Sequence, residues 1–257
     1  PAFGGCDMFM RSKDPNTNCM VFLDDVKGIW GDRLESVVLY GSAARSDFSP
    51  SRSDLNFLIV SDDVKPETLR KVQPLTRRWR RIRIATPLFM RREVIRRSLD
   101  SYPLEFLSIM AAYRLLYGED PLADLEFQSE YVRLQCEREL KSKLLLLREA
   151  YVDSAGSRHV MRGLVSQSLP AMTAIFQGLL YLRGRDWKVW GEDLLKSGNE
   201  TFNLDTGLFR ELWRIKKEQG RPQTETMHKA MSRYINEIER LATWVDQGGL
   251  RNEKALS

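Results

Sequence analysis

The chain has 257 residues, 42% hydrophobic and 29% charged, which is the composition of a globular protein long enough for two modest domains. No apolar run reaches the roughly 18 residues that a transmembrane helix needs, and the N-terminal residues do not form a leader. We therefore expect a cytoplasmic protein without a signal peptide or membrane contact. Its three cysteines are odd in number and widely spaced, which argues against a disulfide framework and a structural zinc site.

The net charge of +5 is concentrated in one segment of the chain. Between Arg70 and Arg97 there are eleven Lys and Arg residues and a single acid, Glu93; we call residues 70–97 the basic segment. Such a cluster is typical of a surface that binds phosphates, either of a nucleic acid or of a nucleotide. The alternative is a solvated face whose arginines pair with acids of the C-terminal half.

The first 20 residues show no hydrophobic period, and we expect a tail. After it, residue spacing predicts a helix over 21–30, strands over 36–40 and 55–60, and a helix over 68–79 on either side of Pro74. A third strand is expected within residues 82–90, and helices over 91–98 and 104–116. Residues 21–122 would then form one domain.

Residues 123–257 have a different character, because apolar residues recur at helical spacing and no strand pattern remains. Long helices are expected over 131–151, 160–182 and 227–245, with shorter ones over 188–195 and 206–217. The sequence thus predicts an α+β fold: a small mixed sheet with flanking helices, followed by an all-α helical bundle.

Candidate site residues surround the loop between the first two predicted strands. The first strand ends at Gly41-Ser42, where backbone amides can approach a phosphate closely, and Arg45 adds positive charge. The second begins Ser53-Asp54-Leu55-Asn56. Because side chains two residues apart on a strand point the same way, Asp54 and Asn56 can reach one divalent cation.

Gly41-Ser42 followed after eleven residues by Asp54-Leu55-Asn56-Phe57 resembles the signature of the nucleotidyltransferase superfamily, which includes polymerase-β-like and aminoglycoside nucleotidyltransferases. The resemblance implies a nucleoside triphosphate as substrate and Mg²⁺ as cofactor. It also implies that Gly41, Ser42, Arg45, Ser53 and Asn56 contact the nucleotide, and that Asp54 is catalytic and binds metal with Asn56. In two-domain members of the family a small-molecule acceptor lies between the domains.

The sequence departs from this family pattern at two of three carboxylates. Where the family has a second acid the chain has Asn56, whose amide oxygen can bind a cation but brings no charge. The third predicted strand contains no Asp or Glu. Asp62 and Asp63 lie about eight residues further along the strand, roughly 26 Å away, and Asp47 is in the intervening loop.

Three functions remain open. The chain either binds nucleotide with an incomplete metal site and weak or no catalysis, or it is an active Mg²⁺-dependent transferase of nucleoside monophosphate to a small-molecule or protein hydroxyl. The third alternative is a nucleic-acid-binding protein that uses the basic segment. The incomplete carboxylate set favours the first.

Overall fold

The computed structural model describes residues 14–45, 54–217 and 223–247. Contacts divide the chain into two compact units, which are described separately. The sheet unit comprises the described residues up to Ser98 together with Ala112–Glu126. The helical unit comprises Leu99–Ala111 and the described residues from Phe127 onward. No helix among the described residues is long and apolar enough to cross a membrane.

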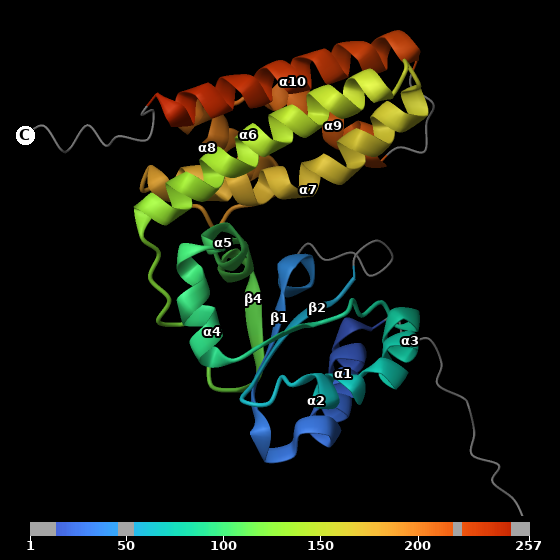
Figure 1. The fold of residues 1–257 in the computed structure, drawn as a ribbon, viewed down its shortest axis with the longest axis vertical. Coiled ribbons are helices and arrows are strands. Elements are labelled where there is room, and N and C mark those ends of the chain that lie inside the picture. Colours follow the sequence, from blue (N-terminus) through green and yellow to red (C-terminus); the bar gives the residue numbers. More distant parts are fainter. Residues whose placement is uncertain (1–13, 46–53, 218–222, 248–257) are drawn as a thin grey trace, which may run out of the picture. The chain divides into compact units, whose positions relative to one another are not determined.

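The sheet unit contains a four-stranded mixed sheet in the order β3-β2-β1-β4 (Figure 1). The strands are β1 (Leu34–Tyr40), β2 (Asn56–Ser61), β3 (Leu88–Met90) and β4 (Tyr113–Gly118). Strand β1 is antiparallel to both β2 and β4, whereas β2 and β3 are parallel. The predicted fold class, a small mixed sheet with flanking helices, is therefore confirmed.

Four helices accompany this sheet: α1 (Pro15–Trp30), α2 (Pro66–Arg70), α3 (Gln73–Arg81) and α4 (Arg92–Arg97). Helices α1 and α3 lie beside each other in Figure 1. Phe22 of α1 stacks on Phe57 of β2 with ring centroids 3.9 Å apart, and Trp79 of α3 packs against Phe22 at 4.9 Å. These apolar contacts anchor both helices on the sheet.

Helix α1 begins six residues earlier than the sequence prediction, within the segment expected to be a tail. Asp14 caps its first turn, accepting hydrogen bonds from the backbone N–H groups of Asn16 and Thr17, and Pro15 occupies the first helical position. An Asp-Pro pair is a helix-start signal. The hydrophobic spacing begins only later in the helix, and the prediction, which relied on that spacing, therefore began at residue 21.

Strand β4 corrects the prediction of a helix over residues 104–116. The helix α5 (Pro103–Ala111) ends at Ala111, and the following residues pair with β1, for example Arg114 with Leu39. Leucine and tyrosine fit either structure, so pairing with a distant strand decides the outcome here. The third predicted strand is also shorter than expected, because residues 82–87 contribute only an isolated bridge between Ile84 and Leu55.

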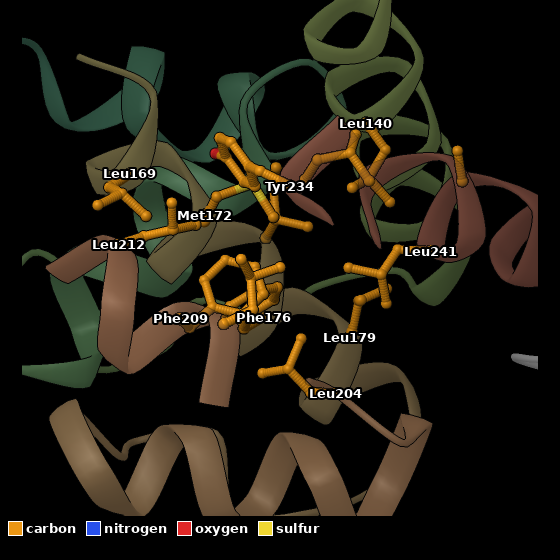
Figure 2. Close-up of a cluster of buried hydrophobic side chains, with 14 of the residues drawn as sticks. Leu140, Leu169, Met172, Phe176, Leu179, Leu204, Phe209, Leu212, Tyr234 and Leu241 are labelled. Atoms are coloured by element: carbon orange, nitrogen blue, oxygen red, sulfur yellow. The ribbon is translucent and has the colours of Figure 1, made fainter. Parts of the chain in front are cut away.

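The helical unit consists of α5 and five further helices, which bury one continuous apolar core. These are α6 (Ser129–Asp153), α7 (Arg158–Leu182), α8 (Gly191–Phe202), α9 (Thr206–Lys217) and α10 (Thr224–Asp246). Phe209 packs edge-on against Phe176 and Tyr234, with ring centroids 4.9 and 6.0 Å apart, and Figure 2 labels these three side chains within the core. Burial raises the pKa of the Tyr234 hydroxyl to about 12.

Helix α5 packs with the other helices, so the two compact units divide at different residues from the predicted 122/123 boundary. Leu104 and Leu107 of α5 belong to the helical core. The buried Gln135 of α6 accepts a hydrogen bond from the Leu104 backbone N–H at 2.8 Å and donates one to Glu105. The chain therefore enters the helical unit at residue 99, returns for β4, and leaves the sheet unit after residue 126.

Candidate functional site

The predicted Gly41-Ser42 turn lies at the end of β1, beside the start of β2. Tyr40 and Asn56 are directly paired across the two strands. Gly41 follows with φ +77° and donates its backbone N–H to the Ala112 carbonyl at 2.9 Å. This left-handed conformation favours glycine, and it turns the chain into the short 3₁₀ helix Gly41–Ala44.

The Asn56 side chain lies next to this turn. A methyl group added at Gly41 would lie 3.5 Å from the Asn56 amide nitrogen, so Gly41 and the Asn56 side chain are neighbours. Tyr40, one residue before the turn, is half-buried, and burial raises the pKa of its hydroxyl. The structure thus brings together Gly41 and Asn56 as the sequence pattern predicts.

Asp54 stands two residues before Asn56, just outside β2, and its carboxylate forms an ion pair. Its Oδ1 lies 3.3 Å from Nε of Arg83, and the two side chains are 57% and 47% exposed. The backbone brings these residues together as well, because the Leu55 N–H donates to the Arg83 carbonyl at 2.7 Å. Arg83 therefore occupies the segment beside β2 where the family pattern expects the third carboxylate.

The end of helix α3 determines the position of Arg83. The Ile84 N–H bonds to the Trp79 carbonyl at 2.9 Å and the Arg83 N–H to the Arg80 carbonyl at 3.2 Å. This pair of bonds is a Schellman motif, whose residue after the cap adopts a left-handed conformation and is usually glycine. Here that residue is Arg83, with φ +65°.

Sequence reasoning recognised the missing acid but not the arginine in its place. Arg83 was one of eleven cations in the basic segment, and nothing in its spacing distinguished it from the others. The bridge between Leu55 and Ile84 is what brings Arg83 next to Asp54, and such strand pairing cannot be read from one sequence.

Of the other predicted site residues, Ser42 and Arg45 lie in the turn that follows Gly41. The Ser42 carbonyl accepts a hydrogen bond from the Arg45 N–H at 3.2 Å, which closes the 3₁₀ turn. Both residues are half-buried. Ser53 and Asp47 lie outside the described residues.

These donors do not fit a two-magnesium site. One carboxylate is engaged by a guanidinium, the neighbouring ligand is a neutral amide, and the described residues contain no group of three or more Asp, Glu, His or Cys that could hold a metal. Asp63 is committed at the other end of β2, where it pairs with Arg33 at 2.7 Å and accepts a hydrogen bond from Thr68. A pair of divalent cations needs more anionic ligands than this.

Several cations of the basic segment pair with acids, all within the sheet unit and not, as one alternative expected, in the C-terminal half. The pairs are Arg78 with Asp25, Arg83 with Asp54, Arg91 with Glu93, and Arg92 with Glu35 and Glu119. The exposed Arg96 and Arg97 border a hollow of about 630 Å³ together with Arg91, Arg92 and three acids. The segment is therefore partly neutralised.

Comparisons with known proteins concern the sequence pattern and the fold of the chain. Residues 19–108 match the family model described as "Nucleotidyltransferase domain". No curated protein sequence matches the chain. Among solved structures, the spectinomycin adenyltransferase AAD(9) from Enterococcus faecialis, determined with ATP and spectinomycin, superposes with a TM-score of 0.55. The match covers 88% of this chain and 100% of that one.

At 12% identity the superposition with the adenyltransferase shows a common fold. The family model adds the sequence pattern, and it ends within α5, so it spans β1, β2, β3 and the turn at Gly41. Residues 19–108 are therefore similar in sequence pattern to a nucleotidyltransferase domain, and the chain shares the fold of the adenyltransferase.

Proposed function

We propose that the chain binds a nucleoside triphosphate at the junction of β1 and β2 and transfers a nucleotide weakly or not at all. Support for binding comes from the match to the nucleotidyltransferase domain model and from the Gly41 turn, whose left-handed backbone lies beside the Asn56 amide. Gly41, Ser42, Arg45, Ser53 and Asn56 would contact the nucleotide. Asp54 remains as the one catalytic carboxylate.

The observation that carries the proposal of weak catalysis is the ion pair between Asp54 and Arg83. Nucleotide transfer requires a hydroxyl to attack the α-phosphorus while pyrophosphate leaves, and a base must accept the hydroxyl proton. A guanidinium stays protonated at all accessible pH values, so Arg83 cannot serve as that base. Loss of two anionic ligands also weakens any metal-assisted activation of the hydroxyl.

An active Mg²⁺-dependent transferase is the second candidate, since the structural neighbour is an adenyltransferase determined with ATP and spectinomycin. By analogy the acceptor would be a small-molecule hydroxyl. A third candidate, nucleic acid binding, rests on Arg96 and Arg97, which form no ion pair with any acid in the described ranges. Its affinity would fall steeply with salt.

Thermal unfolding with each nucleoside triphosphate, with and without Mg²⁺, tests the proposal. A triphosphate at a hundredfold over its dissociation constant should stabilise the fold by about 2.7 kcal/mol, raising the melting temperature by about 5 to 10 °C. Pyrophosphate release should remain near background in the same samples. Absence of a shift with every triphosphate would refute the binding site, and rapid turnover would establish the second candidate.

A further inference from the structure

Besides lacking two acids of the family pattern, the site contains a cation, Arg83, so its net charge differs further from that pattern. Three carboxylates carry three negative charges, which two Mg²⁺ ions convert to a net charge of about +1 when the site is loaded. Here Asp54 and Arg83 cancel, and Asn56 is neutral. Without any metal the site is therefore close in charge to a metal-loaded family site, whereas three bare carboxylates would repel a triphosphate.

Arg83 also has the geometry of a phosphate ligand. It is half exposed, its guanidinium lies 3.3 Å from Asp54, and Asp54 precedes Asn56, the neighbour of Gly41, by two residues. The planar guanidinium carries five N–H donors in a fork geometry that matches phosphate oxygens. An exposed ion pair contributes little to stability, so Asp54 holds the guanidinium only weakly.

We propose that Arg83 takes the place of the metal ions, so that this site binds the triphosphate as the free anion and does so without Mg²⁺. The inference rests on the proposed function, because it concerns the same nucleotide site. It specifies the form of the ligand: a metal-free polyphosphate, held by the Arg83 guanidinium and the backbone amides of the Gly41 turn. Added Mg²⁺ lowers the negative charge of the phosphates, and the one carboxylate of the site, Asp54, is paired with Arg83. Mg²⁺ therefore weakens triphosphate binding or leaves it unchanged.

Isothermal titration of the intact chain with ATP, in EDTA and in Mg²⁺, tests this directly. The affinity of the unmodified protein in EDTA should equal or exceed that in Mg²⁺. Arg83→Asn should lower the affinity in EDTA about tenfold or more, the range of one charge-assisted hydrogen bond to phosphate. Arg83→Lys keeps the charge and should retain much of the affinity.

These substitutions separate binding from folding. Asparagine tolerates the left-handed backbone of residue 83 better than other non-glycine residues, so Arg83→Asn should leave the melting temperature unchanged. The matched control is Arg33→Gln, which breaks a surface ion pair of the same chemistry with Asp63, at the other end of the two strands. It should bind ATP as the unmodified protein does.

The outcomes distinguish the two proposals. Binding that requires Mg²⁺ would overturn the role of Arg83 and leave the nucleotide site intact. An Arg83→Asn variant with unchanged affinity would also overturn it. Failure to bind ATP or any other triphosphate under either condition would instead refute the proposed function itself.

Discussion

Introducing Asn56→Asp and Arg83→Glu together is expected to make nucleotide binding depend on Mg²⁺. The double substitution changes the site from roughly neutral to three negative charges, at residue 83, at its ion-pair partner Asp54 and at residue 56. Free ATP would then be repelled, and its affinity in EDTA should fall about a hundredfold or more, since charged contacts in a partly desolvated site are each worth more than a tenfold change. Mg²⁺ should restore it.

A second measurement on the double variant does not involve nucleotide. Three neighbouring carboxylates repel one another, so Mg²⁺ alone should raise the melting temperature of the double variant and have no such effect on the unmodified protein. Asn56→Asp alone is the control, because Arg83 keeps the net charge of the site at −1 instead of −3, and binding should not come to require Mg²⁺. Metal-dependent binding by this single variant would contradict the account.

Gly118→Ala is expected to destabilise the sheet unit by about 3 kcal/mol. Gly118 ends β4 with φ +77°, a conformation that costs other residues about 1 to 2 kcal/mol. A methyl group there would also overlap the backbone carbonyl oxygen of Glu35, which cannot move without disturbing β1. Calorimetry should show the melting temperature lowered by about 6 to 12 °C.

Gly28→Ala is the matched control for this substitution. Gly28 lies inside α1 of the same unit, and an added methyl group there meets nothing within 4 Å. Alanine should stabilise that helix by up to about 1 kcal/mol. Equal melting temperatures for the two variants would show that the close approach of β4 to Glu35 is not present in solution.

The resemblance to nucleotidyltransferases was recognisable from the sequence because it depends on residues close together along the chain. Gly41 ends an apolar run and Asp54 precedes the next, and the resemblance to nucleotidyltransferases depends only on these residues and the distance between them along the chain. The helical unit was predictable for a similar reason, since spacings of three and four residues report helices directly.

The remaining features depend on contacts between distant segments. Strand β4 forms because β1 has a free edge, and its own residues resemble a helix as much as a strand. The position of Arg83 follows from the end of α3 and from the bridge to Leu55, neither of which has a periodic signal. Arg83, the residue that most affects the proposed chemistry, could therefore not be distinguished in the sequence from the other cations of the basic segment.

The location of the bound nucleotide tests the central claim most directly. Backbone amide spectra of the isotope-labelled protein, titrated with ATP in EDTA, should show the largest shifts at Gly41, Ser42 and Asn56, where the turn after β1 meets β2. Shifts confined to Arg92–Arg97 would place the anion on α4 of the basic segment instead. That result, or no shifts at all, would contradict a nucleotide site at the junction of the two strands.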